Sequence, residues 1–191
     1  MATSYLERAF EEHQEVAAAT LPAIMPSFDR LLAACVGAIR SGGKIMFFGN
    51  GGSAADAQHL ATELTVRFIK NRAPIAAIAL TTDTSALTAI GNDLGFDQLF
   101  ARQIQALGRA GDVAIGISTS GRSPNVIAAL RSAKDMDIVP AAFGGGDGGD
   151  MVGLADPLLL IPSTTTARIQ EMHIAVGQML CGALEIELNL V

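Results

Sequence analysis

The sequence predicts an α/β fold: a five-stranded parallel sheet, doubly wound, with helices on both faces. Five short apolar runs alternate with helical patterns along most of the 191 residues. The runs are continuous rather than alternating, as in strands that are buried on both faces. Half of the residues are hydrophobic, with 20 glycines and no tryptophan, which suits aliphatic helices packed on a sheet. Strands that alternate with helices predict right-handed parallel crossovers.

Residues 1–40 are predicted to form a helical extension ahead of the sheet. Apolar residues at helical spacing indicate a first helix over about residues 4–19. Pro22 and Pro26 are expected to break it, because proline lacks an amide hydrogen and clashes with the preceding turn. A capping serine then predicts a second helix over about residues 27–40.

The remaining residues, 41–191, are predicted to form an α/β core that ends in a long helix. The expected strands are residues 44–48, 76–80, 112–117, 138–143 and 157–161. The expected helices are residues 54–67, 84–92, 98–108, 124–136 and 165–190. No repeat or flexible linker interrupts the sequence, so residues 1–191 are interpreted as a single domain.

Two loops rich in small residues follow the first and third expected strands. We call Gly49–Ser53 the glycine loop and Ser118–Ser123 the hydroxyl loop. Small residues let backbone amides approach an anion, and each loop precedes a helix N-terminus with partial positive charge. In the common strand order 2-1-3-4-5, ligands lie at the carboxyl ends of strands 1 and 3. The loops therefore predict a pocket for a phosphorylated small molecule.

Each loop also has a simpler interpretation. The glycine loop matches neither the dinucleotide-binding nor the Walker pattern, so alone it could be a plain strand-to-helix turn. The hydroxyl loop could be a capped turn, with Ser123 as N-cap and Pro124 in the first helical turn. A capped turn needs no further hydroxyls, yet the loop also holds Ser118, Thr119 and Ser120. The hydroxyl loop is therefore the stronger phosphate signal.

Charge and composition argue against several classes of protein. The formal net charge is −6 and no basic stripe with interleaved aromatic residues is present, so direct nucleic-acid binding is not expected. No apolar run reaches the length of a membrane span, and the acidic N-terminus does not resemble a secretory signal. Cys35 and Cys181 lie in apolar helical patterns, as buried reduced thiols do. A cytoplasmic protein without membrane contact is expected.

His59 and Glu63 are four residues apart on the helix that follows the glycine loop, with Asp56 one turn earlier. This spacing places the three side chains on one helix face. An imidazole and a carboxylate can ligate a divalent metal or act as acid and base, whereas the simpler alternative is an exposed surface pair. Asn92 and Asp93 can either end a helix or line a sugar site.

Four ordered segments resemble the phosphoheptose isomerase family, the sedoheptulose 7-phosphate isomerases of the sugar isomerase (SIS) superfamily. These segments are Gly49–His59, Gly91–Asp93, Gly116–Gly121 and Ile169–His173. The resemblance implies a flavodoxin-like three-layer sandwich, a homotetramer with active sites at subunit interfaces, and one zinc ion per subunit. It also implies an aldose–ketose isomerase that converts D-sedoheptulose 7-phosphate to D-glycero-D-manno-heptose 7-phosphate through an enediol. That reaction is the first step towards the ADP-heptoses of the lipopolysaccharide core.

The resemblance further implies a role for individual residues. Phosphate-binding positions of the family match Ser118, Thr119, Ser120 and Ser123. Sugar-binding positions match Asn50, Gly51, Gly52, Ser53, Glu63, Asn92, Asp93 and Gln170. Zinc-binding positions match His59, Glu63, Gln170 and Gln178. Catalytic acid/base positions match Glu63 and Gln178.

Gln178 departs from the family pattern, because the second active-site histidine falls at this position. Glutamine has no titratable proton near neutral pH, and its amide oxygen is a weak ligand for zinc, which prefers nitrogen and sulfur. Isomerisation needs one proton moved between adjacent carbons and another moved between two oxygens. Either Glu63 and water carry both transfers, or another residue substitutes, or turnover is impaired.

Gln170 and Gln178 are separated by eight residues, which is about 12 Å of helix rise. Two side chains so far apart on one helix can hardly reach one metal ion. One of these positions is therefore expected to serve the site of a neighbouring subunit, so that catalysis requires the oligomer.

Two other functions stay open at this point. The chain could be a non-catalytic SIS protein that binds a phosphosugar and acts as a tetrameric partner of the replication initiator protein, a reading that Gln178 favours. It could also isomerise another sugar phosphate. A product assay with and without zinc separates these readings.

Overall fold

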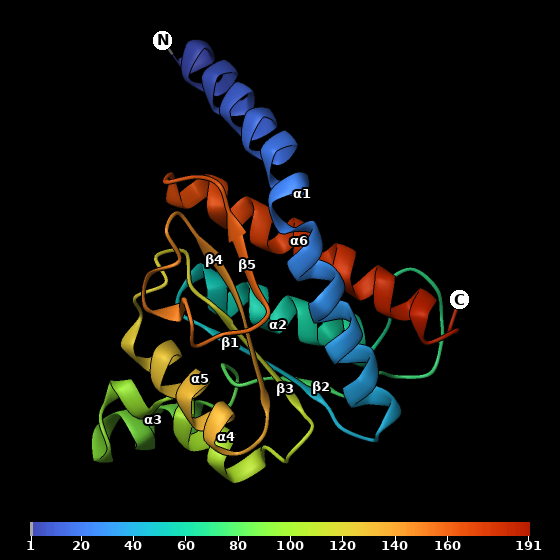
Figure 1. Cartoon of the computed structure of the whole chain (residues 1–191). Helices are drawn as coiled ribbons and strands as arrows, with labels where there is room; N and C mark the ends of the chain where they lie inside the picture. The colour runs from blue at the N-terminus through green and yellow to red at the C-terminus, as the bar shows by residue number, and fades with distance from the viewer. Residues whose placement is uncertain (1) are drawn as a thin grey trace.

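The computed structural model of the chain describes residues 2–191 (Figure 1). The helices are α1 (Ala2–Arg40), α2 (Gly52–Thr65), α3 (Thr84–Asp93), α4 (Ala101–Leu107), α5 (Pro124–Asp135) and α6 (Thr166–Glu187). The strands are β1 (Ile45–Gly49), β2 (Ala77–Ala79), β3 (Val113–Ile117), β4 (Val139–Gly145) and β5 (Leu158–Ile161). Two short 3-10 helices are η1 (Phe96–Gln98) and η2 (Gly149–Met151). All five predicted strands are present.

The five strands form one parallel sheet in the order β2-β1-β3-β4-β5, which confirms the predicted strand order. In the central pair, Gly49 at the end of β1 is in register with Ile117 at the end of β3. The glycine loop and the hydroxyl loop therefore leave the sheet side by side, at the point where the strand order reverses.

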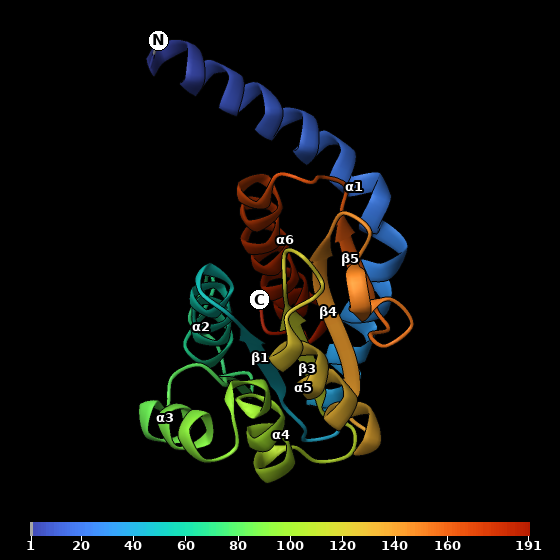
Figure 2. The ribbon, with the colours of Figure 1, turned by 90° about the vertical axis from the view of Figure 1, so that its left-hand side faces the viewer.

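Alternate side chains of the central strands enter two different cores, which makes the molecule a three-layer sandwich. Ile45 and Phe47 of β1 pack with α1, α2 and α6 on one face, whereas Met46 and Phe48 pack with α3, α4 and α5 on the other. All four side chains are completely buried. Figure 2 shows α2 and α6 on one side of the sheet and α4 and α5 on the opposite side.

The prediction of two N-terminal helices is wrong: α1 runs without a break through Pro22 and Pro26. Each proline removes one main-chain hydrogen bond and bends a helix, and α1 changes direction near its middle (Figure 1). Both prolines are exposed, so their rings do not disturb the packed face of the helix. Ile24 and Leu31 are buried in the core and hold the C-terminal half on the sheet.

The N-terminal half of α1 projects from the body of the molecule (Figures 1 and 2). By length and composition alone, Thr3–Arg40 is long and apolar enough to cross a membrane, contrary to the expectation from the sequence. One such helix is weak evidence, because the core helix of a soluble protein passes the same test. The C-terminal half of α1 packs in the core against α6 and β5.

The remaining differences concern helix boundaries. The segment predicted as one helix at residues 98–108 is a 3-10 turn, η1, followed by the shorter α4. Helix α2 begins at Gly52, inside the glycine loop and two residues before the predicted start. The last two residues of the glycine loop, Gly52 and Ser53, therefore belong to the first turn of α2.

Candidate functional site

The glycine loop lies against β3 and α5. A side chain at Gly49 would overlap the carbonyl of Ile117, so glycine permits this close approach. Gly51 has φ +55°, a conformation that favours glycine. The side chains of Asn50 and Asn125 exchange two amide hydrogen bonds of 2.8 Å, and Asn125 is buried at the start of α5. Sequence reasoning did not assign Asn125 a role.

The hydroxyl loop is held over the N-terminus of α5. The Ser118 amide donates to the carbonyl of Phe143 at 3.0 Å, and Gly121 adopts φ +66° close to the backbone of Gly148. The Oγ atoms of Ser118 and Ser123 lie 3.1 Å apart. Ser123 is the N-cap residue of α5, but its side chain makes no capping hydrogen bond, so the expected side-chain cap is absent. The hydroxyls gather instead at a helix N-terminus, a setting that suits an anion.

A cavity of about 390 Å³ opens beside the hydroxyl loop. The residues that line it come from the loop, from the end of β4 and from the segment after β5: Thr119, Ser120, Arg122, Gly145, Gly146, Asp147, Ser163, Thr164, Thr166 and Ile169. Arg122 donates a hydrogen bond of 2.7 Å to Asp147, which lowers the pKa of this carboxyl. Sequence reasoning missed the hydroxyl run at residues 163–166, although it directly follows a strand as the first two loops do.

His59, Glu63 and Gln178 form a cluster where α2 faces α6, and we call it the His59 cluster. Nε2 of His59 lies 3.2 Å from Oε1 of Glu63 and 3.1 Å from Nε2 of Gln178. The His59 side chain is 46% exposed and that of Glu63 is 20% exposed, so solvent and small molecules reach the imidazole. The structure thus brings together a carboxylate, an imidazole and the unexpected glutamine within one chain.

Gln170 lies two turns before Gln178 on α6 and contacts the beginning of α2 instead. A side chain at Gly52 would overlap the amide of Gln170, so glycine makes room for it. Gln170 also hydrogen-bonds Asp56, whose pKa rises to about 6 because burial outweighs the opposing effects of His59 and Gln170. Within residues 2–191, Oδ2 of Asp56 is buried without a hydrogen-bond partner.

Gln170 and Gln178 of α6 therefore both contact α2 of the same chain. Gln170 lies at the beginning of α2 and Gln178 lies further along it, at His59. Close contact of the two helices depends on Gly177, because a Cβ there would lie 2.5 Å from Leu60. This placement accounts for Gln170 and Gln178 without a second subunit. The role of either residue in a neighbouring site stays a prediction.

The donor spacing in the His59 cluster suits a small tetrahedral ion. Donors at the usual 2.0–2.1 Å from zinc lie roughly 3.3 Å apart, close to the two distances measured from His59. Gln178 joins such a set when its amide turns its oxygen towards the imidazole. Among the described residues, no three His, Cys, Asp or Glu side chains gather at one point. The cluster thus offers three donors, of which one is an amide.

Asn92 and Asp93 are not brought to this site within the chain. They form the exposed end of α3, and the Asn92 amide donates to Asp93 at 2.6 Å. The cavity of about 190 Å³ beside the glycine loop is lined by other residues from the α3–α4 region, namely Leu87, Phe96, Leu99 and Phe100. His173, interpreted from the sequence as a core residue, is buried and bonded to the Gly144 carbonyl at 3.0 Å.

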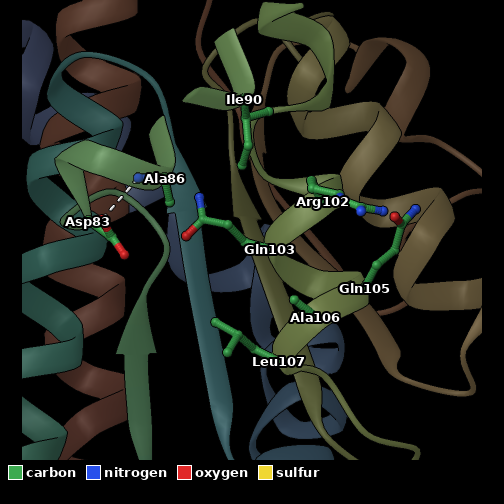
Figure 3. Close-up of a pocket in the computed structure, with 8 residues that line it drawn as sticks. All are labelled: Asp83, Ala86, Ile90, Arg102, Gln103, Gln105, Ala106 and Leu107. Carbon is green, nitrogen blue, oxygen red and sulfur yellow. Dashed lines mark hydrogen bonds between the residues drawn. The ribbon is translucent and has the colours of Figure 1, made fainter. Parts of the chain in front are cut away.

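A separate cavity of about 430 Å³ lies between α3 and α4 (Figure 3). Its lining includes Asp83, Ile90, Arg102 and Gln103, and it contains none of the site residues predicted from the sequence. The Gln103 amide donates to the Leu80 and Leu99 carbonyls at 2.9 and 3.0 Å. These bonds give Gln103 a structural role, apart from the two loops.

Comparison with known proteins identifies the family to which the chain belongs. The family model of the SIS domain matches residues 9–145. A phosphoheptose isomerase from Paramagnetospirillum magneticum is 60% identical over 182 residues, which cover 95% of both chains. Phosphoheptose isomerase 1 from Campylobacter jejuni is 51% identical over 178 residues, covering 92% of this chain and 94% of its own.

Solved structures agree with these relatives. A phosphoheptose isomerase from Neisseria gonorrhoeae superposes with a TM-score of 0.92 at 42% identity, covering 97% of this chain and all of its own. One from Francisella tularensis gives a TM-score of 0.94 at 35% identity, with 97% and 99% covered. The chain therefore belongs to the SIS-domain proteins and, within them, to the phosphoheptose isomerase family of sugar-phosphate isomerases.

Proposed function

We propose that this chain converts D-sedoheptulose 7-phosphate to D-glycero-D-manno-heptose 7-phosphate through an enediol. The observation that carries the proposal is the position of Glu63. It is a half-buried carboxylate, 3.2 Å from an imidazole, on the helix that begins in the glycine loop. The names and identities of the relatives support the choice of substrate.

The hydroxyl loop binds the phosphate in this proposal. Ser118, Thr119, Ser120 and Ser123 supply hydroxyl donors, and the N-terminus of α5 adds partial positive charge. Asn50, Gly51, Gly52, Ser53 and Gln170 border the sugar beside the hydroxyl loop. Asn92 and Asp93 reach a sugar only in an assembly of several chains.

Glu63 moves the proton between the two adjacent carbons, since a single carboxylate can take it from one and return it to the other. The transfer between the two oxygens needs a second group. Gln178 occupies the family histidine position and has no titratable proton near neutral pH. Gln178 can orient His59 or a substrate oxygen through its amide, and water carries the proton in its place.

One zinc ion per subunit belongs to this proposal, held by His59, Glu63 and Gln178, with Gln170 as the fourth ligand given by the family pattern. When bound, such an ion polarises the sugar oxygens and stabilises the negative charge of an enediolate. The spacing in the His59 cluster supports three of these ligands. Gln170 would have to leave Asp56 to join them.

A homotetramer is also proposed, with α1 as the contact between subunits. Tyr5, Leu6, Phe10 and Leu21 on the projecting half of α1 are between 56% and 70% exposed. Exposed apolar side chains gathered on a projecting helix favour burial against another chain. An assembly of this kind would also offer Asn92 and Asp93 to a neighbouring site.

The two cysteines bear on where in the cell the protein acts. Burial raises the pKa of both thiols, that of Cys181 to about 12, so the cysteines stay protonated and free, as in a cytoplasmic protein. We propose that the whole chain acts as one SIS domain in the cytoplasm. Its product would enter the ADP-heptose branch that supplies the lipopolysaccharide core.

Time-resolved proton NMR of sedoheptulose 7-phosphate with the purified protein, with and without added zinc, tests the proposal. Appearance of the aldose signals at a rate proportional to enzyme supports the isomerase. Binding of the sugar phosphate without any product would overturn it and favour the non-catalytic reading. If the protein converted only a different sugar phosphate, that compound would be assigned as its substrate instead.

A further inference from the structure

We propose that Arg72, through its ion pair with Glu185, is a positioning residue that holds Glu63 in register with Gln178. The inference rests on the proposed isomerase function, because it assigns the pair a task in placing the catalytic carboxylate. The pair lies at the C-terminal end of α2, whereas the glycine loop lies at its N-terminal end. Neither Arg72 nor Glu185 touches the proposed sugar site.

Arg72 lies in the segment between α2 and β2, and its guanidinium is completely enclosed. Its Nε donates to Oε1 of Glu185 on α6 at 2.8 Å. Its Nη2 donates to the Glu63 carbonyl at 2.8 Å, and its Nη1 donates to the Leu64 carbonyl at 2.7 Å and the Ala73 carbonyl at 3.1 Å. The side chains of Arg72 and Glu185 are 1% and 2% exposed.

These contacts close the C-terminal end of α2. The last carbonyls of a helix have no partner within it, and a cation is favourable there. Arg72 supplies donors to two of these carbonyls, one of them that of Glu63 itself. Oε1 of Glu185 also accepts the Phe68 amide at 3.1 Å, which fixes the chain just beyond the helix.

The same pair links α2 to the helix that carries Gln178. Glu185 lies seven residues, or two turns, after Gln178 on α6. A shift of one helix along the other would therefore break the ion pair and change the 3.1 Å contact between His59 and Gln178. The guanidinium is rigid and planar, so it fixes direction as well as distance.

A role in holding α2 and α6 in register explains the Arg72–Glu185 ion pair better than a contribution to folding stability does. Two buried charges lose their hydration, and apolar residues of similar size are often at least as stabilising. Four donated hydrogen bonds compensate the guanidinium here, and three of them go to the end of α2 and to α6. Misplacement of a catalytic group by about 1 Å can lower a rate roughly 100-fold.

The phosphate-binding loop stands on β3 and α5, away from this pair. Loss of Arg72 is therefore expected to lower kcat while KM for the sugar phosphate stays nearly constant. A purely structural role would instead lower the amount of folded enzyme without changing kcat per folded site.

Three variants of the full chain test the inference. Arg72→Lys keeps the charge opposite Glu185 but cannot reach both carbonyls and the carboxylate. Arg72→Met combined with Glu185→Met removes both charges together and preserves an apolar contact. Arg30→Lys is the matched control, because Arg30 also pairs with an acid, Asp156, but both side chains are exposed.

We expect Arg72→Lys and the double variant to melt within a few degrees of the parent, with kcat roughly 10- to 100-fold lower and KM within about threefold. Arg30→Lys should keep both constants. A kcat within twofold of the parent in either folded variant would overturn the inference. Failure of both variants to fold would also overturn it, in favour of a purely structural pair.

A second measurement separates this inference from the proposed function. Amide hydrogen exchange over residues 60–70 should become faster in Arg72→Lys but not in Arg30→Lys, whatever the substrate. If the parent is inactive while exchange changes as expected, the isomerase proposal fails and the positioning of α2 stands. If the parent is active and exchange is unchanged, the positioning role fails alone.

Discussion

At the scale of single residues, the chemistry of the site depends on the two side chains that contact His59, those of Glu63 and Gln178. Glu63 can take and return a proton, whereas the Gln178 amide only donates or accepts a hydrogen bond. Both contact the same imidazole nitrogen, at 3.2 and 3.1 Å. A change at either position is therefore expected to alter the proposed proton transfer and to leave the hydroxyl loop unchanged.

Glu63→Gln should lower kcat by roughly 100- to 10,000-fold, because the amide keeps the shape of the side chain but cannot act as a base. The rate of product formation is measured by proton NMR at saturating substrate. Glu187→Gln, at the exposed end of α6, is the matched control and should retain the parent rate. Unchanged turnover of Glu63→Gln would refute the assigned base.

Gln178→His should raise kcat at least tenfold, since an imidazole restores a group that titrates near neutral pH. The same NMR assay measures the gain, and its pH profile should acquire a new limb near the histidine pKa. Gln105→His, at an exposed position on α4, controls for adding a histidine. A variant no faster than the parent would show that this position does not limit the reaction.

The Asp112 carboxylate holds Lys44, the residue just before β1, and the turn at Arg109. Burial alone would raise its pKa, but hydrogen bonds from the Lys44 side chain, the Lys44 amide and the Arg109 amide outweigh this and lower it. A depressed pKa in the folded state means stability that is present above the unfolded value near 3.9 and is lost as pH falls below it.

Asp112→Asn should therefore lower the free energy of unfolding by roughly 1.5–3 kcal/mol at pH 7. At pH 3 the difference between variant and parent should shrink, because the carboxyl of the unfolded parent is then largely protonated, which favours the unfolded state. Urea denaturation at the two pH values gives both numbers. Asp135→Asn, exposed at the end of α5, should change neither, and an equal loss at both pH values would contradict the argument.

At the scale of elements, the site depends on how closely α6 approaches α2. Gly177 sets this distance, because an added Cβ would lie 2.5 and 2.7 Å from the two methyl groups of the fully buried Leu60. The same helix pair carries the His59 cluster and, at its far end, the Arg72–Glu185 ion pair. The packing of α6 on α2 therefore determines how closely Gln178 approaches His59 in the candidate site.

Gly177→Ala should destabilise the protein by about 1–2 kcal/mol, because overpacking against Leu60 exceeds the gain in helix propensity. Gly37→Ala in α1 is the matched control: nothing lies within 4 Å of its added Cβ, so it should stabilise by about 0.5–1 kcal/mol. Thermal melting of both variants checks the opposite signs. A Gly177→Ala variant more stable than the parent would show that α2 and α6 can move apart without a loss of folding free energy.

At the scale of the whole molecule, the projecting half of α1 is the feature that a single chain covers only in part. Glu171 on α6 contacts His13 at 2.8 Å, and Thr165 donates to Glu12 at 2.6 Å, so α6 sets the direction of this half. Its apolar side chains Tyr5, Leu6, Phe10 and Leu21 remain exposed in the single chain, so they are available for contact with other chains.

If the chain forms the proposed tetramer, Phe10→Asp combined with Leu6→Asp should give smaller species and lower activity with it, because charges on the helix oppose burial. Light scattering after size-exclusion chromatography gives the mass, and the NMR assay gives the rate on the same fractions. Val152→Asp, an exposed apolar position on the body, is the control. A monomer with full activity would overturn the requirement for an oligomer.

Local sequence was sufficient for the sheet and the two loops. Continuous apolar runs such as residues 113–117 specify buried parallel strands, and the serines and glycines after them specify the turns. The helical spacing of His59 and Glu63 likewise places them on one face without reference to other elements. Residues bonded across elements, such as the Asn50–Asn125 pair, had no comparable local signal.

Tertiary contacts decided the rest. Exposed prolines and buried residues on either side let α1 continue as one bent helix, although proline locally favours a break. Packing of α6 on α2 brought Gln178 to His59, and burial raised the pKa of Asp56. Helix periodicity is a property of neighbours in sequence, whereas the distance between two helices depends on the side chains that meet between them.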